Sequence, residues 1–530
     1  AYEMLRSLVG SEMCIRDSNW ELCIADDASS QPHVHRILEE YAKADKRIKI
    51  ILRSENGHIS AASNTALDEV TGELITFLDH DDRLAKHALF WVVKDILAHP
   101  EAMLWYSDED KINEKGERYD PYFKSDWNPD LFLSYNLINH LAVYRTALIQ
   151  EIAGFREGYE GAQDYDLALR VIEQIEASQI RHIPRILYHW RAVSGSTATR
   201  QDEKPYALTA AQKAISEHLE RRDIEARVTE APNVPGAIRV QYALPAALPL
   251  VSLIIPTRNG VDFLSRCVES ILEKTDYQNF EIVIVNNESD DPATLAYMTQ
   301  LEETEKARII DYPHPFNYAE INNMAVEQAE GELIGLLNND LEIISPDWLT
   351  EMVSHALRPE IGAVGARLWY PNEILQHGGV ILGIGSVAGH SHKYLQRHQF
   401  GYFSRACLIQ NFSAVTAACL VMRKQNFLAV GGLDAEHLGI AFNDVDFCLK
   451  IKALGLRIVW TPYAELYHHE SVSRGHENTP EKQARFQKEC DYMKSRWGNI
   501  LVNDPAYSPN LTLETEDFAY AWPPRVPSII

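Results

Sequence analysis

The stretch GELIGLLNNDLE (331–342) decides the fold, because it repeats a stretch in the first half of the chain, GELITFLDHDD (72–82). Three more pairs of segments match in the same order. They are NWELCIADDASS (19–30) with NFEIVIVNNESDD (279–291), GAQDYDLALR (161–170) with GIAFNDVDFCLK (439–450), and IPRILYHWR (183–191) with TPYAELYHHE (461–470). A repeat of this length indicates a duplicated domain rather than a solenoid of short units.

The spacings within the two copies agree except in the middle. Asp26 and Asp79 are 53 positions apart, and the corresponding distance in the second copy is 52. The next interval, from Asp79 to Asp164, is 85 positions, whereas its counterpart from Asn338 to Asp444 is 106. The second copy therefore carries an insertion of 21 residues (106 − 85) between its second and third motifs.

Each copy has the pattern of an α/β domain. VSLIIP (251–256), FEIVIV (280–285) and ELIGLL (332–337) are short apolar runs with Pro or Asn at their ends, typical of buried parallel strands. Between the first two runs, apolar residues recur at helical spacing: Phe263, Leu264, Cys267, Val268, Ile271 and Leu272. This order predicts mostly parallel sheets flanked by helices, with ligands bound outside the carboxyl ends of the strands.

A chain of 530 residues is too long for one core and predicts two domains. We expect a first domain over 19–230, a linker over 231–249, a second domain over 250–500 and a C-terminal tail over 501–530. Residues 1–18 do not fit the repeat.

The first strand of the second copy would map to positions before the chain begins, because Glu21 aligns with Glu281. SLVGSEMCIRDS (7–18) resembles translated adapter read-through more than protein, so we interpret 1–18 as non-native. A parallel sheet without an interior strand leaves backbone groups unpaired. We therefore expect the first domain to be truncated and to bind its ligand poorly.

Composition excludes several classes of protein. Apolar residues make up 46% and charged residues 24%, which is typical of a globular protein. The net charge of −26 argues against a nucleic-acid partner, since such proteins need basic faces. No apolar run approaches the ~20 residues of a membrane span, which predicts a soluble or peripheral protein. Seven Cys without a C-x-x-C pair favour a reducing cytoplasm.

Acidic residues cluster where strands are expected to end. Asp79-His80-Asp81-Asp82 places three carboxylates within four residues, and such like charges repel unless a cation binds. Oxygen ligands suit a hard divalent cation, and we favour this interpretation over an exposed acidic turn. The second copy keeps oxygen ligands in Asn338-Asn339-Asp340.

Two further pairs of polar residues follow expected strands. Asp26-Asp27 and Asn286-Asn287 suit turns, but one side chain of each pair could instead accept the imide N–H of a uracil or thymine ring.

Other polar residues open amphipathic helices or follow the last matched strands. Asp164 and Asp166, like Asp444 and Asp446, open helices, and only one acid of each pair is needed to cap a helix. The other could serve as a general base. His189 and His468 follow matched strands and are either core residues or ligands.

With these motifs in place, both copies resemble inverting, GT-A-fold nucleotide-sugar glycosyltransferases of the large family 2. The whole chain is similar to tandem bacterial enzymes of that family associated with O-antigen or other surface polysaccharides. The similarity covers residues 19–518, and four motifs in order, twice, make it highly specific.

The resemblance implies a role for each matched residue. In the first copy these are nucleotide-sugar binding by Asp26, Asp27 and Asp79, metal binding by Asp79, Asp81 and His189, and proton abstraction by Asp164. In the second copy they are nucleotide-sugar binding by Pro256, Asn286, Asn287 and Asn338, metal binding by Asn338, Asp340 and His468, and proton abstraction by Asp444. SRG (473–475) resembles the loop that closes over the diphosphate.

The resemblance also implies the partners. They are a divalent metal, Mn²⁺ or Mg²⁺, UDP- or dTDP-sugar donors, and a glycan or lipid-linked glycan acceptor. The expected location is the cytoplasm or, peripherally, the inner face of the cytoplasmic membrane. One activity per domain is the expectation.

Two alternatives to a pair of transferases stay open. Nucleotidyl transfer would need a basic, Gly-rich loop after the first strand, and PTRNG (256–260) has one Arg and one Gly. The other alternative is a non-catalytic sugar- or nucleotide-binding scaffold in one domain, either the Asn-rich second or the truncated first. Retained Asp164 and Asp444 argue against it.

Overall fold

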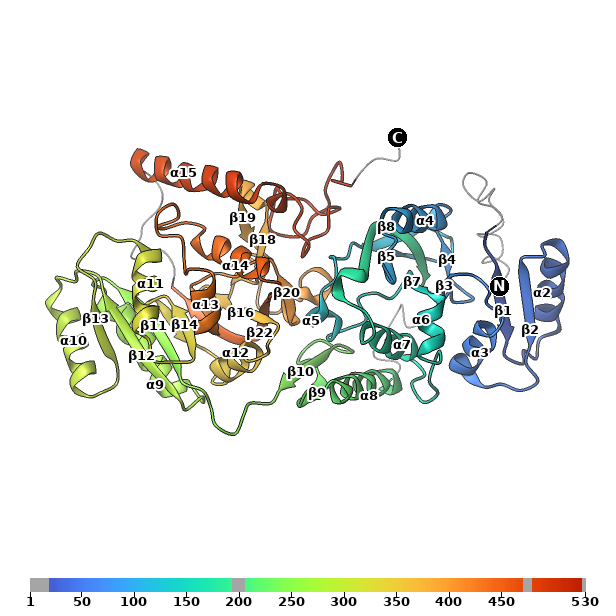
Figure 1. The fold of residues 1–530 in the computed structure, drawn as a ribbon, viewed down its shortest axis with the longest axis horizontal. Coiled ribbons are helices and arrows are strands. Elements are labelled where there is room, and N and C mark those ends of the chain that lie inside the picture. The colour runs from blue at the N-terminus through green and yellow to red at the C-terminus, as the bar shows by residue number, and fades with distance from the viewer. Residues whose placement is uncertain (1–18, 193–204, 470–478, 527–530) are drawn as a thin grey trace. The chain divides into compact units, whose positions relative to one another are not determined.

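A computed structural model of the chain describes residues 19–192, 205–469 and 479–526. The chain divides into two compact units (Figure 1). The first comprises Ala1–Trp127, Phe132–Val240 and Val526–Ile530, and the second comprises Asn128–Leu131 and Gln241–Arg525. The predicted tail therefore belongs to the second unit through Arg525, and the predicted linker contains a strand, β10 (Ile238–Tyr242).

The second unit is built on one ten-stranded sheet. In spatial order its strands are β13 (Arg308–Asp311), β12 (Phe280–Asn286), β11 (Val251–Thr257), β14 (Leu333–Leu337), β21 (Cys419–Arg423), β16 (Ile361–Trp369), β22 (Arg457–His468) and β15 (Leu341–Ile343), with β17 (Leu375–His377) beside β16 and β20 (Gln410–Phe412) beside β22. The strands from β13 to β14 are parallel, as predicted. The half that follows is mixed, because β21 runs antiparallel to both of its neighbours.

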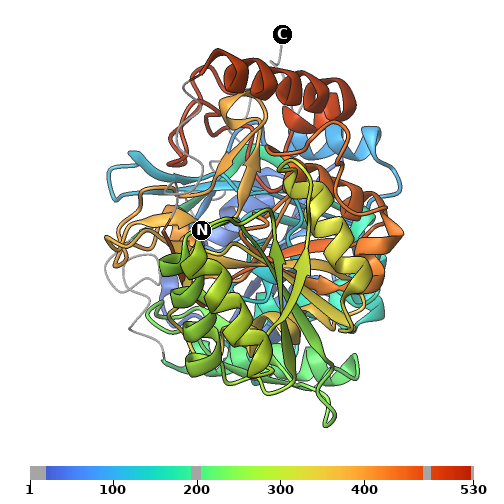
Figure 2. The ribbon, with the colours of Figure 1, turned by 90° about the vertical axis from the view of Figure 1, so that its left-hand side faces the viewer.

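Helices cover the parallel half of this sheet on both faces. Figure 2 shows α9 and α10 on one side of the strands and α11 on the other. The helices of the unit are α9 (Val261–Lys274), α10 (Pro292–Glu303), α11 (Tyr318–Gln328), α12 (Trp348–Ala356), α13 (Lys424–Ala429), α14 (Asn443–Ala453) and α15 (Pro480–Trp497). Gly260 precedes α9 with φ 71°, a left-handed conformation that glycine adopts without steric cost. Asp291 caps α10 by accepting a hydrogen bond from the Thr294 backbone N–H.

The core of the second unit lies between the sheet and its helices. Leu253, Val268 and Trp348 are among its fully buried side chains. A separate hairpin, β18 (Val380–Leu382) with β19 (Ala388–His390), lies in the part of the sequence that holds the insertion. The C-terminal segment packs onto it, since the Asp504 carboxylate accepts a hydrogen bond from the Leu382 backbone N–H at 2.8 Å.

The first unit repeats this arrangement in part. A six-stranded sheet has the order β3 (Leu74–Thr76), β7 (Ala142–Arg145), β5 (Leu104–Ile112), β8 (Ile180–Arg191) and β4 (Arg83–Leu84), with β6 (Arg118–Tyr122) beside β5. Two parallel strands, β1 (Leu22–Asp26) and β2 (Ile48–Leu52), form a sheet of their own, and β9 (Ala226–Glu230) pairs with β10. The helices are α2 (Pro32–Ala44), α3 (His58–Leu67), α4 (Ala88–Ala98), α6 (Thr146–Glu151), α7 (Gln163–Ile172) and α8 (Pro205–Arg221). The short helix α5 (Pro129–Phe132) follows β6, and most of it belongs to the second unit.

The two units differ in the parallel half of the sheet. In the second unit β11 lies between β12 and β14, the counterparts of β1 and β3. Among the residues described, no strand takes that place in the first unit. The predicted non-native segment 1–18 lies outside the described residues, so its assignment stays a prediction. No helix in the described parts of the chain is long and apolar enough to cross a membrane.

Candidate functional site

The polar residues predicted for nucleotide binding in the second unit gather where β11, β12 and β14 end. The Asn339 side-chain amide donates to Thr257 Oγ1 at 2.9 Å, which joins the ends of β14 and β11. Pro256 is the residue before Thr257, on the same strand. The Asn286 side chain accepts from the Ser289 backbone N–H and donates to Asp311. The three carboxyl ends therefore form one polar rim, as parallel strands should.

Asn287 differs from its neighbours on this rim, because one of its polar atoms lacks a partner. The side chain is 1% exposed and donates through Nδ2 to the backbone oxygen of His314 at 2.8 Å. Within the described residues its Oδ1 has no hydrogen-bond partner. Burying such an acceptor unpaired costs free energy, so the atom is a candidate contact for a ligand donor.

The three residues predicted to bind metal in the second unit lie together. The Nε2 atom of His468 is 3.2 Å from Asp340 Oδ1 and 3.2 Å from the Asn338 side-chain nitrogen. Its Nδ1 is hydrogen-bonded to Gln376 Oε1 at 2.6 Å. When Nδ1 donates to Gln376, Nε2 presents a lone pair beside a carboxylate oxygen, which is the arrangement that a cation favours. When His468 is protonated instead, it holds the pKa of the Asp340 carboxyl below its usual range, although burial opposes ionisation.

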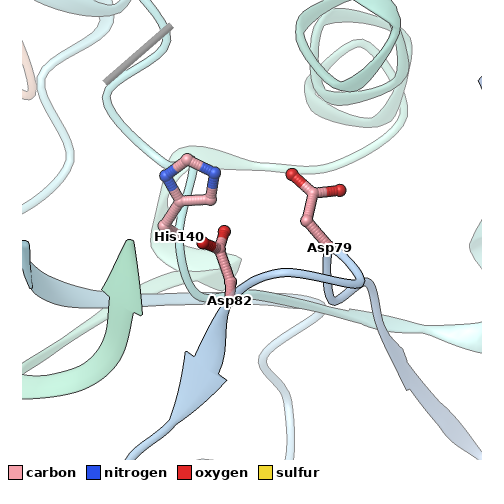
Figure 3. A group of neighbouring side chains, drawn as sticks. All are labelled: Asp79, Asp82 and His140. Carbon is pink, nitrogen blue, oxygen red and sulfur yellow. The ribbon is translucent and has the colours of Figure 1, made fainter. Parts of the chain in front are cut away.

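In the first unit, Asp79, Asp82 and His140 form the corresponding group (Figure 3). Each offers one ligand atom, and the three atoms lie within 4.8 Å of one another. Asp79 and Asp82 come from one segment, and His140 comes from the segment that precedes β7. Two carboxylate oxygens and one imidazole nitrogen are a donor set that suits Mn²⁺ or Mg²⁺.

Asp82 is the buried member of this group. Its Oδ2 accepts from the Tyr188 hydroxyl at 2.5 Å, and its Oδ1 accepts from the Arg191 backbone N–H at 2.7 Å. Burial raises the pKa of Asp82 to about 6. These hydrogen bonds fix the carboxylate, while the raised pKa shows that a nearby positive charge would stabilise its ionised form.

The other predicted ligands of the first unit lie outside this group. The Nδ1 atom of His189 is hydrogen-bonded to Asp110 Oδ1 at 2.5 Å. The backbone oxygen of Asp81 accepts from the Arg191 guanidinium at 2.6 Å. The roles predicted for Asp81 and His189 therefore remain predictions.

Each predicted base lies beside a second acid with a different environment. Asp164 is half-buried, and its Oδ2 accepts from the Asn136 side chain at 3.0 Å. Burial raises the pKa of Asp164, and the charges of His140 and Asp79 act on it as well. The base therefore lies near the candidate metal group. Asp166, by contrast, is fully buried and ion-paired with Arg156 and with Arg170, so it serves the fold.

The second unit repeats this contrast. Asp444 is half-buried and accepts from the Ala417 backbone N–H at 3.1 Å. Burial raises its pKa despite that hydrogen bond. The neighbouring acid, Asp446, is fully buried and accepts from the Trp497 indole N–H at 2.8 Å. In both units one acid of the pair is structural, and the other is held near the ends of the strands.

The carboxylates of Asp26 and Asp27, which were predicted to bind the nucleotide, are hydrogen-bonded or ion-paired to other residues of the chain. Asp26 accepts from the Ser29 backbone N–H and is bonded to His35 at 3.1 Å. Asp27 accepts from the Gly57 backbone N–H and lies 2.8 Å from the Arg53 guanidinium.

The model of the family described as "Glycosyl transferase family 2" matches residues 2–153 and 252–425. The chain belongs to glycosyl transferase family 2. One matched segment falls in each unit, so the chain carries two GT-A domains in tandem. The first match begins inside the segment predicted as non-native.

Two curated relatives from bacteria match almost the whole chain. An uncharacterised protein, y4gI, of Sinorhizobium fredii is 50% identical over 96% of the chain. The O-antigen biosynthesis protein RfbC of Myxococcus xanthus is 39% identical over 94%. The chain spans 56% and 38% of the length of these two relatives. A solved mannosyltransferase of Pyrobaculum calidifontis, in complex with GDP-Man and Mn²⁺, aligns over 57% of this chain and 77% of its own with 18% identity and a TM-score of 0.37.

Asp82 and His140 are two residues of this glycosyltransferase family member that motif matching did not assign. Asp82 is the last acid of the cluster 79–82, and the sequence alone does not show which of the three carboxylates there would bind a cation. Strand pairing distinguishes them, because Arg83 lies opposite His189 as Leu341 lies opposite His468. The residues just before Arg83 and Leu341 are Asp82 and Asp340. His140 belongs to no matched motif and had no signal in the sequence.

Proposed function

We propose that the chain transfers a sugar from a nucleotide-diphosphate donor to a hydroxyl of a glycan acceptor, with a divalent cation in each domain. The observation that carries this proposal is the group Asp79, Asp82 and His140, close enough to Asp164 for its charges to act on that carboxyl. A charge-binding group beside a half-buried base is what such a transfer requires.

The cation site of the first domain consists of Asp79, Asp82 and His140, and that of the second of Asn338, Asp340 and His468. The buried Asp340 Oδ1 fits this assignment, since it lies 3.2 Å from His468 Nε2, so that one cation could contact both atoms. A bound divalent cation would offset the negative charge that develops on the leaving diphosphate.

Asp164 and Asp444 act as general bases. Each takes the proton from the acceptor hydroxyl as its oxygen attacks the anomeric carbon, while the bond to the diphosphate breaks. A raised pKa suits this task, because it brings the base closer to the working pH. One displacement without a covalent intermediate inverts the anomeric centre, so no second carboxylate nucleophile is needed.

The donors are UDP- or dTDP-sugars, and Asn287 supports this choice in the second domain. Its partnerless Oδ1 can accept the imide N–H of a uracil or thymine ring. A glycan on a lipid carrier, as acceptor, would bring the chain to the inner face of the cytoplasmic membrane.

We further propose that each domain has its own activity, with weaker donor binding in the first, because no described strand there takes the place of β11. The alternative, a non-catalytic second domain, draws on one observation: Asn338 stands where the first domain has Asp79, so the second site has one carboxylate fewer.

The test is a screen of nucleotide sugars with Mn²⁺ or Mg²⁺ on the full chain and on two variants, Asp164→Asn and Asp444→Asn. Two activities with different donors, each lost in one variant, would support the proposal. NMR of the product reports the anomeric configuration. A single activity that survives in Asp444→Asn would favour a non-catalytic second domain. Covalent attachment of sugar to the protein would exclude a mechanism with a single displacement.

A further inference from the structure

Lys124 is a lysine with no access to solvent, an unusual place for an ammonium group. It is 1% exposed and lies just after β6. Its Nζ donates to the backbone oxygens of Asn139 and His140, the latter at 3.1 Å, and lies 3.5 Å from Glu109 Oε2. Burying a charge is costly unless it is paired and hydrogen-bonded, and these three partners meet that condition.

Each of the three partners of the Lys124 ammonium group belongs to His140, precedes it in the chain or contacts its side chain. The backbone of His140 has φ 51°, a left-handed conformation that non-glycine residues rarely adopt. The Lys124 ammonium group donates hydrogen bonds to the carbonyl oxygens of His140 and of Asn139 before it, and these bonds hold the turn in place. Glu109, the third partner, also contacts the side chain of His140, because its Oε2 lies 3.2 Å from Nδ1.

The imidazole of His140 is therefore fixed on several sides. Glu109 holds Nδ1, and the Tyr188 ring stacks on the imidazole with centroids 4.6 Å apart. The Tyr188 hydroxyl in turn donates to Asp82. In Figure 3 the other ring nitrogen of His140 is on the side of Asp79. When Nδ1 donates to a carboxylate, Nε2 keeps its lone pair for a metal, which is how carboxylates orient metal-binding histidines elsewhere.

We propose that Lys124 and Glu109 are positioning residues of the first domain's cation site, holding His140 so that its Nε2 faces Asp79 and Asp82. This inference rests on the cation site of the proposed function. It adds two residues that touch neither the cation nor the sugar. Glu109 lies on β5, and Lys124 follows β6.

The test is Mn²⁺ binding to the full chain, with the second site removed by Asp340→Asn in every sample. Titration followed by the electron paramagnetic resonance signal of free Mn²⁺ gives the affinity. Lys124→Met and Glu109→Gln should each weaken binding about 10- to 100-fold, the usual effect of losing an outer-shell partner. Lys111→Met is the matched control, since Lys111 is also a lysine of this region, on β5, and its ammonium group pairs with Asp120. It should leave the affinity unchanged.

A spectroscopic readout separates positioning from a merely structural role. The nitrogen coupling from a bound imidazole, seen by pulsed electron paramagnetic resonance, should be present in the parent chain and lost in Lys124→Met, while near-UV circular dichroism stays the same. If Lys124→Met does not fold, Glu109→Gln decides by the same two measurements. Unchanged affinity and an unchanged nitrogen signal in the folded variants would overturn the inference.

Asp82→Asn distinguishes this failure from failure of the cation site itself. If Asp82→Asn weakens Mn²⁺ binding but Lys124→Met and Glu109→Gln do not, the site stands and the positioning role is wrong. If Asp82→Asn also leaves binding unchanged, the site is wrong and the inference falls with it.

Discussion

His182 should make the stability of the first domain depend on pH in a predictable direction. Its side chain is fully buried between Asp108, 2.9 Å from Nε2, and Asp126, 3.2 Å from Nδ1. Burial opposes its charge, but the two carboxylates outweigh burial and raise the pKa of His182 to about 9. Compared with an ordinary value of 6.5, this difference corresponds to about 3 kcal/mol of stabilisation at ~1.36 kcal/mol per pH unit.

The sign follows from the direction of the pKa change. Because the pKa of His182 is higher in the folded state, its stabilisation is complete below about pH 6.5 and is lost as the pH rises through about 9. Urea unfolding between about pH 6.5 and 9.5 should show this loss. Amide hydrogen exchange in β5 and β8 assigns it to the first domain, since Asp108 and His182 lie on these strands.

His182→Gln supplies the comparison, because glutamine can still hydrogen-bond but does not titrate. The variant should be less stable at about pH 6.5 and should lack most of the pH dependence in this range. A parent chain and variant with the same pH slope would refute the ion pair as its origin. The control is Lys111→Met, which removes an ion pair on β5 but leaves His182 intact.

Three further predictions concern the paired acids and the second cation site. Asp444→Asn should lower transfer by the second domain by ~10²–10⁴-fold with donor affinity retained, as measured by initial rates and calorimetry; equal loss of both would make Asp444 a binding residue. Asp166→Asn should instead destabilise the first domain by about 3–5 kcal/mol in urea unfolding, because it leaves the buried Arg170 without its carboxylate and removes one of the two carboxylates that pair with Arg156; intact stability would contradict this role. Asp340→Ala should abolish the EDTA-sensitive part of donor binding in the second domain; affinity that EDTA never changes would argue against a cation there.

Much of the fold was predictable because both copies carry strong local patterns. The apolar residues from Phe263 to Leu272 predicted α9, and the three apolar runs of the second copy became β11, β12 and β14. The mixed half of the sheet was not predictable in the same way. Its strand β21 pairs antiparallel with β14, about 85 positions earlier, and no local pattern encodes such a long-range pairing. The prediction of parallel pairing therefore holds from β13 to β14 and for the pairs β1–β2, β5–β8 and β16–β22, but not for β21, which is antiparallel to both of its neighbours.

The candidate site was predictable to the extent that motifs carry it. Asn338, Asp340 and His468 were predicted from the repeat and lie together, and Gln376, which holds His468, was missed. Gln376 lies between the second and third motifs of the second copy, in the interval that contains the insertion, where the first copy gives no guide. His140 was missed for the same physical reason: a metal site collects residues by spatial proximity, and its backbone lies outside every repeated motif.

The one-residue offset between the two copies explains why sequence matching and the structure assign different acids in the first domain. Matching GELITFLDHDD to GELIGLLNNDLE aligns Asp81 with Asp340. Strand pairing aligns Asp82 with Asp340 instead, since Arg83 and Leu341 take equivalent places opposite the two matched histidines. Asp82 and Asp340 each come directly before a strand, β4 and β15, so a shift of one residue in the turn changes which carboxylate stands next to the strand. Because the segment 79–82 has acids at both positions, each alignment offers a carboxylate as the counterpart of Asp340: Asp81 by the sequence match and Asp82 by the strand pairing.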